Sequence, residues 1–213
     1  MDIVLFGMQG SGKGTQGKIL AEMYGLKVFD MGAELRGMIE SGTELGVKIK
    51  DIVERGDLVD DDTIMEVIEN FLKSISSDQS VVFDGIPRTM NQAEKLLSLL
   101  KSHGRKVFGL HVKISEKEAI SRLTQRRVCS NCKEVYPAFY KNDDCAKCHG
   151  ALITRQDDSN LDAITKRLEN YQRETESVIQ HFYGVDRLIE VDGEQPIPDV
   201  TEEMVDKAGY LFS

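Results

Sequence analysis

The 213-residue sequence lacks any apolar run that approaches the ~20 residues needed to span a membrane. It also lacks a basic excess, because 27 lysines and arginines face 36 acidic residues and give a net charge of −9. That charge disfavours nonspecific binding to nucleic acid or to an anionic membrane, so any anion site must be a local basic cluster. We expect a cytoplasmic protein, because the first apolar run, Ile3–Phe6, leaves no room for a signal peptide.

Cysteine is scarce, and all four residues fall in one stretch. Cys129 and Cys132 form one C-x-x-C pair, and Cys145 and Cys148 form a second after a twelve-residue loop. Two such pairs are typical of a tetrahedral Zn²⁺ site, whereas disulfides are disfavoured in a reducing compartment. We predict a structural zinc, because four thiolates leave no open coordination position. His149 is the one alternative ligand in this stretch, and we interpret it as a solvated loop residue.

A glycine-rich segment, Gly7–Thr15, follows the first apolar run directly and opens a helical segment. Backbone N–H groups, Lys13 and the helix N-terminus would together form a phosphate cradle. The general P-loop pattern has Ser or Thr after the lysine, but here Gly14 stands there and Thr15 follows. Gly-x-x-Gly-x-Gly-Lys-Gly-Thr resembles the nucleoside monophosphate kinases.

The remainder alternates strand and helix signals, which predicts an α/β fold with a parallel sheet. Further strands are expected at 80–84, 108–114 and 188–191, and helical apolar stripes cover 64–72 and 93–100. Two segments break the alternation. Residues 30–60 are expected to form two short helices, Ala33–Glu40 and Glu44–Glu54, and 127–158 holds the cysteines. Both are interpreted as insertions on the sheet.

Arginines dominate the candidate functional residues, and no nucleophile or catalytic histidine stands out. Arg88 follows a predicted strand, where open α/β sheets bind ligands. Planar guanidinium groups bind phosphate oxygens bidentately, so arginines that flank the insertions form a candidate polyphosphate clamp. Its members are Arg36, Arg88, Arg122, Arg126, Arg155 and Arg167.

The whole chain resembles the adenylate kinase family, in its bacterial form with a long zinc-bearing lid. The matching segments are 7–15, Gly32 with Leu35 and Arg36, 56–59, 84–89 with Gln92, 126–129, 155–158 and 166–168. The resemblance implies a P-loop kinase with a five-stranded parallel sheet core at 1–29, 60–122 and 159–213. A monophosphate-binding insertion would occupy 30–59, and the lid 123–158.

The resemblance also implies which residues act. The implied reaction is the reversible transfer of the terminal phosphoryl group from MgATP to AMP, giving two ADP. Catalytic residues would be Lys13, Asp84, Arg88, Arg122, Arg126, Arg155 and Arg167, with Asp84 orienting hydrated Mg²⁺. ATP would be bound by Gly10, Ser11, Gly12, Lys13, Gly14, Thr15, Arg126, Val135, Tyr136 and Gln195. AMP would be bound by Met31, Arg36, Asp57, Leu58, Val59, Gly85, Ile86, Pro87, Arg88, Gln92, Arg155 and Arg167. Asp157 and Asp158 match acids that position these arginines.

Three departures bear on specificity. Met31 and Ala33 stand where the family usually has Thr and Asp, and the 155–167 segment is one residue longer. Met31 removes a polar contact to the acceptor base and motivates a rival prediction, a UMP or CMP kinase.

A rival of another class is a nucleotide-gated zinc-ribbon protein that binds nucleic acid through lid lysines. Charge and the absence of interleaved aromatic residues disfavour it. We expect a monomer that binds ATP, AMP and ADP.

Overall fold

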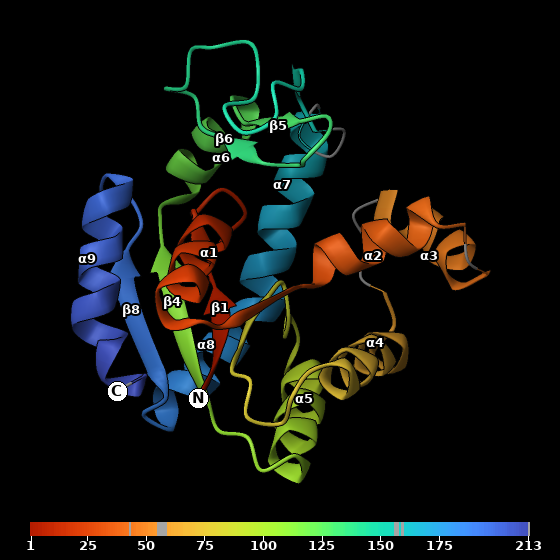
Figure 1. Ribbon diagram of the computed structural model, residues 1–213, viewed down its shortest axis with the longest axis vertical. Helices are drawn as coiled ribbons and strands as arrows, with labels where there is room; N and C mark the ends of the chain where they lie inside the picture. The colour runs from red at the N-terminus through yellow and green to blue at the C-terminus, as the bar shows by residue number, and fades with distance from the viewer. Residues whose placement is uncertain (43, 55–58, 156–157, 159, 213) are drawn as a thin grey trace.

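The computed structural model describes residues 1–42, 44–54, 59–155, 158 and 160–212. A parallel sheet lies at its centre, with strand order β2-β3-β1-β4-β8 (Figure 1). Its strands are β1 (Asp2–Phe6), β2 (Lys27–Asp30), β3 (Val81–Asp84), β4 (Val107–Lys113) and β8 (Leu188–Asp192). The expected α/β class with a five-stranded parallel sheet is therefore confirmed.

Helices cover both faces of this sheet because its central strands are apolar on both sides. In β1, Ile3 and Leu5 pack into one cluster, while Val4 and Phe6 pack into another. The first cluster includes side chains of α1 (Lys13–Tyr24) and α9 (Ile197–Ala208). The second includes side chains of α4 (Asp61–Ser74), α5 (Met90–Ser102) and α8 (Glu176–Gly184).

Two modules stand outside the sheet in Figure 1. One consists of α2 (Met31–Glu40) and α3 (Glu44–Glu54), which match the expected pair of short helices. The other is an antiparallel sheet, ordered β6-β5-β7, that carries the cysteine stretch. Its strands are β5 (Arg127–Cys129), β6 (Val135–Tyr136) and β7 (Leu152–Ile153). The chain enters this module from α6 (Glu116–Thr124) and leaves it into α7 (Leu161–Asn170).

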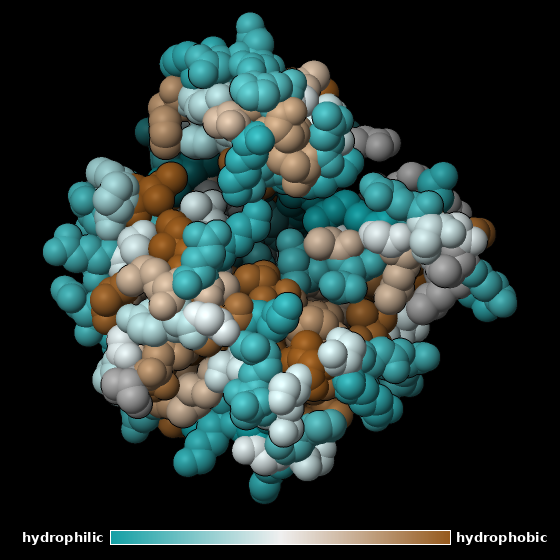
Figure 2. Space-filling model, viewed as in Figure 1, coloured by the Kyte–Doolittle hydropathy of each residue, from teal (hydrophilic) through white to brown (hydrophobic). Residues whose placement is uncertain are grey.

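A single turn of π-helix, Tyr171–Thr175, joins α7 to α8, and a 3-10 turn, Gly209–Leu211, follows α9. Among the described residues, no helix has the length and apolar content required to cross a bilayer. The visible face is hollowed between the cysteine-bearing module, the α2–α3 pair and the sheet, and hydrophilic side chains gather there (Figure 2).

Candidate active site

The phosphate loop connects β1 to α1 at the carboxyl edge of the sheet. Gly7, Gly10 and Gly12 have φ angles of 146°, 88° and 89°, a region that side chains rarely adopt. A Cβ on Gly7 would lie 2.5 Å from both Ser11 Oγ and the Val112 carbonyl oxygen. Gly12 precedes α1, and no side chain caps that helix. Within the loop, Ser11 N donates to the Met8 carbonyl oxygen at 3.1 Å and Lys13 N donates to Ser11 Oγ at 3.4 Å. The loop leads directly into the N-terminus of α1, a place where backbone N–H groups can bind an anion.

Gly14 differs from the general P-loop for a reason that the structure makes visible. A Cβ at this position would lie 2.9 Å from Asp84 Oδ2, at the end of β3. A serine or threonine would compete with the carboxylate for the same space. The glycine therefore allows an acidic group to approach the lysine of the loop.

Lys13 and Asp84 face each other across the loop, with Nζ 3.9 Å from Oδ1. Burial lowers the pKa of Lys13; Asp84 opposes that change, and Arg88 and Arg126 add to it. Burial also raises the pKa of Asp84, against the opposing effect of Lys13 and with reinforcement from Asp30. Asp30 ends β2 and is in register with Asp84, so two carboxylates stand at neighbouring strand ends. Such oxygen ligands suit a hydrated Mg²⁺.

Arg88 lies in a segment that follows β3. Gly85 has a φ of 83°, and the Arg88 Nε donates to its carbonyl oxygen at 2.9 Å. Burial lowers the pKa of Arg88, and the nearby guanidinium groups of Arg167 and Arg36 contribute to the lowering. Polyphosphate would relieve this concentration of positive charge.

Asp158 joins two predicted arginines. Its side chain is fully buried; it accepts from Arg126 Nε at 2.8 Å and from Arg167 Nη1 at 3.0 Å. Burial lowers the pKa of Arg126, and Arg155 and Arg167 lie close enough to contribute. The structure thus brings Arg126 and Arg167 together on one acid, with the charge of Arg155 close to Arg126. Asp157 lies outside the described residues.

Arg122 is held differently from the other predicted arginines. Its Nε donates to Glu118 Oε1 at 2.7 Å, one turn earlier on α6, and not to Asp158. Its charge contributes to the lowered pKa of Glu194, whose main causes are hydrogen bonds from Ser115. Arg122 is therefore held along α6 by Glu118.

Part of the predicted acceptor set lies near the start of α2 and the segment after β3. Met31 and Val59 are buried, at 2% and 5% exposure, and a Cβ on Gly85 would lie 3.6 Å from Met31 Cβ. Ile86 is buried and precedes Pro87 by a cis peptide bond. Gln92, also buried, lies on the first turn of α5, capped by Thr89. Asp57 and Leu58 lie outside the described residues.

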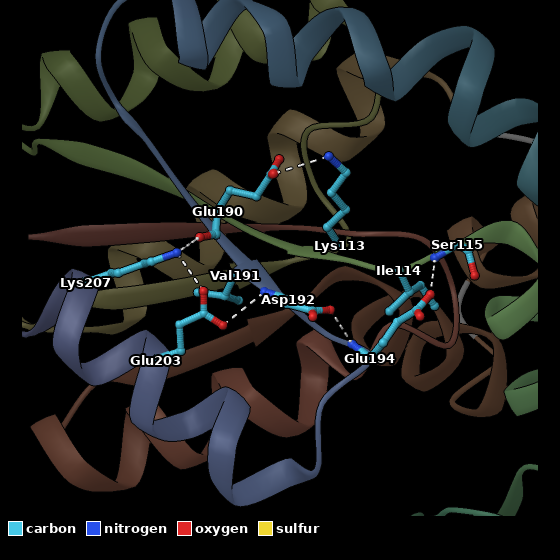
Figure 3. A pocket seen from close by; sticks show the side chains of 9 residues that line it. All are labelled: Lys113, Ile114, Ser115, Glu190, Val191, Asp192, Glu194, Glu203 and Lys207. Atoms are coloured by element: carbon cyan, nitrogen blue, oxygen red, sulfur yellow. Dashed lines mark hydrogen bonds and ion pairs between the residues drawn. The ribbon is translucent and has the colours of Figure 1, made fainter.

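Gln195 follows β8 and donates through Nε2 to Glu203 Oε2 at 2.6 Å. The same Glu203 carboxylate, through its Oε1, accepts from Lys207 at 2.6 Å. A pocket between β4, β8 and α9 lies beside this network (Figure 3), and Glu194 Oε1 closes one side by accepting from the Ser115 N–H at 2.8 Å. Gln195 is thus anchored by Glu203, a residue that lines this pocket.

A buried glutamine that the sequence did not single out connects the phosphate-loop helix α1 to α9. Gln16, on α1, donates from Nε2 to the Ile197 carbonyl oxygen at 3.0 Å and accepts from Thr201 Oγ1 at 2.9 Å. The one sequence feature that could have indicated Gln16 is its position directly after Thr15. A side-chain amide on the helix that follows a phosphate loop can bond to a neighbouring element. Asp30 was likewise missed, because its place beside Asp84 depends on the pairing of β2 with β3, which no local pattern indicates.

The four cysteine thiols converge, with all Sγ atoms within 4.8 Å of one another. Cys129 and Cys148 are 3.4 Å apart, and Cys132 and Cys145 are 3.5 Å apart. These distances exceed an S–S bond of about 2.05 Å and approach the roughly 3.8 Å edge of a tetrahedron with 2.3 Å Zn–S bonds. The donor set therefore fits one tetrahedral metal ion.

Both C-x-x-C turns have the same local geometry. Asn131 N donates to Cys129 Sγ and Lys147 N donates to Cys145 Sγ, each at 3.4 Å. The residues after each pair, Lys133 and His149, have φ angles of 62° and 55°. His149 Nδ1 lies 3.1 Å from Asp144 and is exposed, in accord with its interpretation as a loop residue. Such paired turns present two sulfurs each toward one point.

Val135 and Tyr136, predicted near the donor triphosphate, form β6. Tyr136 is buried, and its hydroxyl contacts Cys145 Sγ at 3.1 Å and accepts from Ala146 N at 2.9 Å. Its side chain therefore supports the cysteine cluster, whereas Val135 is 40% exposed. Glu134, the preceding residue, lies 3.6 Å from Lys18 of α1, so this edge of the module faces the phosphate loop helix.

A parallel sheet, a glycine-rich loop that opens a helix, and arginines gathered at the sheet's carboxyl edge define a P-loop phosphotransferase of the nucleotide kinase class. The adenylate kinase family model matches residues 5–186. The chain belongs to the adenylate kinase family.

Relatives with this name cover nearly the whole chain. An adenylate kinase of Kosmotoga olearia is 38% identical over 209 residues, covering 96% of this chain and 97% of the relative. One of Archaeoglobus fulgidus is 34% identical, with 96% of each chain covered. One of Bacillus pumilus is 33% identical over 216 residues, with 99% of each covered. The resemblance inferred from the motifs is confirmed.

Proposed function

We propose that this enzyme transfers the terminal phosphoryl group of MgATP reversibly to AMP, giving two ADP, as its membership of the adenylate kinase family implies. The observation that most directly supports this proposal is the convergence of Lys13, Asp84 and Arg88 at the carboxyl edge of the sheet. Their neighbours Arg126 and Arg167 share Asp158. This arrangement brings four cations, Lys13, Arg88, Arg126 and Arg167, near one another from four separate parts of the chain.

The chemistry explains the abundance of arginine. The acceptor is a phosphate oxygen that is already anionic, so no general base must activate it. The protein must instead align two polyanions and compensate charge on the transferring group. Lys13 and the loop N–H groups would hold the donor phosphates, while Arg36, Arg88, Arg155 and Arg167 would hold the acceptor phosphate and the group in transfer. Arg122 and Arg126 would neutralise charge from the side of the cysteine-bearing module.

Mg²⁺ would be held near Asp84 through water, where it would neutralise charge between the donor phosphates. Asp30 stands beside it as a second carboxylate. We assign zinc to the cysteine cluster, on the strength of the thiolate donors and their spacing. With four protein ligands, that ion would stabilise the module and take no part in transfer. The module would act as a lid that excludes water.

Gln92 and Met31 would meet the acceptor base, and Gln195 the donor base. A monomer of this composition would bind small nucleotides and not nucleic acid, since the net charge is −9. The closest rival reaction uses UMP or CMP as acceptor, and Met31 is its motivation.

A coupled assay of ADP formation from ATP with AMP, UMP, CMP or GMP in parallel tests the proposal. We expect AMP to have the highest kcat/KM. A higher value for UMP or CMP would establish the rival reaction instead. Gel retention on DNA and RNA at moderate salt, with no shift expected, tests the nucleic-acid alternative.

A further inference from the structure

Asp61, the first residue of α4, contacts the glutamine that we assign to the acceptor base. Its Oδ1 accepts from Gln92 Nε2 at 2.9 Å, and its Oδ2 accepts from the Asn91 side-chain amide. Asp60 caps α4 by accepting from Thr63 N at 2.9 Å, which fixes the backbone just before Asp61. The carboxylate thus bridges the start of α4 and the start of α5.

The other end of the Gln92 amide is held by the backbone. Gln92 Oε1 accepts from Arg88 N at 2.8 Å. A carboxylate can only accept and a backbone N–H can only donate, so the two partners dictate which way the amide faces. Turning it by 180° would set oxygen against carboxylate and NH₂ against N–H at a side chain that is 2% exposed. Unmet polar contacts are costly at such a buried position.

A glutamine free to turn can pair with any base, but one of fixed direction cannot. After these two contacts, Nε2 retains one N–H and Oε1 retains one lone pair. The matching base edge places an amino group toward Oε1 and an unprotonated ring nitrogen toward Nε2. Adenine and cytosine have that edge. Hypoxanthine, guanine and uracil present a carbonyl oxygen and a ring N–H in the reverse order.

We propose that Asp61 is a specificity-determining residue: by fixing the direction of the Gln92 amide, it selects amino bases over oxo bases in the acceptor nucleotide. This inference rests on the proposed function, because it takes the acceptor base to meet Gln92. Asp61 acts through Gln92 and is a positioning residue that need not touch the nucleotide.

The test compares AMP with IMP, its 6-oxo counterpart, as acceptors for the parent enzyme and for Asp61→Asn. The new amide can accept or donate, so it can pair with either end of the Gln92 amide and no longer dictates which way that amide faces. We expect the ratio of kcat/KM for IMP to that for AMP to rise roughly three- to tenfold. AMP remains preferred because Arg88 N still opposes the turn.

Asp62→Asn is the matched control, since it removes the same charge from the same helix turn. Asp62 pairs with Lys95 at 2.6 Å and lies on the exposed side of α4. We expect this variant to leave the ratio at the parent value. An equal rise in both variants would overturn the proposal, because helix-terminal charge would then be the cause.

Melting temperatures of all three proteins establish that they are folded, and the parent alone supplies a second check. A parent that uses IMP as well as AMP overturns the proposal without any variant. So does an Asp61→Asn ratio within twofold of the parent in a folded enzyme that phosphorylates AMP. A parent inactive with every monophosphate would instead refute the proposed function.

Discussion

The five-stranded sheet and the cysteine-bearing sheet are stabilised in different ways. The central sheet buries two large apolar clusters on its two faces. The smaller sheet has a buried cluster of only Cys129, Tyr136 and Cys145, against which Tyr140 and Leu152 pack. So few apolar side chains cannot offset the entropy of ordering the segment from 127 to 153. One region folds by burial, whereas the other would be stabilised by the zinc that we propose at its four thiols.

The two sheets also differ in the role that we propose for them: the edge of the large sheet holds the proposed catalytic residues, and the small sheet supports the segment around them. Lys13 at the start of α1, Asp84 at the end of β3 and Arg88 after it all lie buried at the edge of the large sheet. The cysteine-bearing sheet supplies Arg126 at its entrance, and Asp158 ties that arginine to Arg167 of α7. Changes in the large sheet's edge should therefore alter rate, and changes in the small sheet should alter stability.

Lys13→Met gives the largest expected effect on rate. In the proposed reaction Lys13 would be a point charge near the transferring phosphoryl group, and one such contact is worth on the order of 10²–10³ in kcat. Steady-state kinetics measures the loss, and circular dichroism shows whether the fold is retained. Lys18→Met is the matched control on the same helix, because Lys18 is 52% exposed in its side chain and pairs only loosely with Glu134. Activity of Lys13→Met within twofold of the parent would contradict the assignment.

Cys145→Ser should lower stability and leave the chemical step largely intact. Loss of a metal site belongs to the class of substitutions with multi-kcal/mol effects, and in a chain of this size each kcal/mol lowers Tm by about 2–4 °C. Calorimetry gives Tm, and elemental analysis should show one zinc per parent chain and loss of it in the variant. Ser130→Ala, within the first C-x-x-C turn, should retain the metal. Parent protein without metal, or a folded variant with no activity at low temperature, would show that the two regions are not divided in this way.

Strong local signals made much of this division predictable from the sequence. The strand–loop–helix at Gly7–Thr15 and the paired C-x-x-C motifs each depend on a few residues close together in the chain. The helix Glu44–Glu54 was predicted with its observed bounds. β2 gave no such signal, because of its four residues only Phe29 is buried. It pairs with β3 alone, and that pairing is not a local property.

Contacts across long stretches of chain could not be predicted. Gln16 reaches Ile197 across 181 residues, and Asp61 reaches Gln92 across 31. Neither contact leaves a periodic pattern, because a single polar side chain needs only one partner that the fold happens to bring near. Asp158 was indicated by resemblance, but the sharing of its two oxygens between Arg126 and Arg167 required the structure.

Met31→Thr has the smallest expected effect, a change in selectivity between acceptor nucleotides, and it tests the proposed acceptor site at the edge of the large sheet. Met31 begins α2, is 2% exposed and packs in the apolar cluster that contains Phe29 and Leu35. A hydroxyl there offers the base one hydrogen bond, worth roughly 0.5–1.5 kcal/mol or about three- to tenfold in selectivity. We expect kcat/KM for AMP to rise relative to UMP and CMP.

The same substitution also shortens a buried side chain, so some loss of stability should accompany the gain in selectivity. Met38→Thr, further along α2 where the side chain is half-buried, is the control for that loss, and it should leave selectivity unchanged. Gln92→Ala should act in the opposite sense, because it removes the amide that Asp61 and Arg88 hold in place. Competition assays with mixed monophosphates measure all three variants directly. If Met31→Thr and Met38→Thr shift selectivity alike, then Met31 is a packing residue and the acceptor base is read by Gln92 without it.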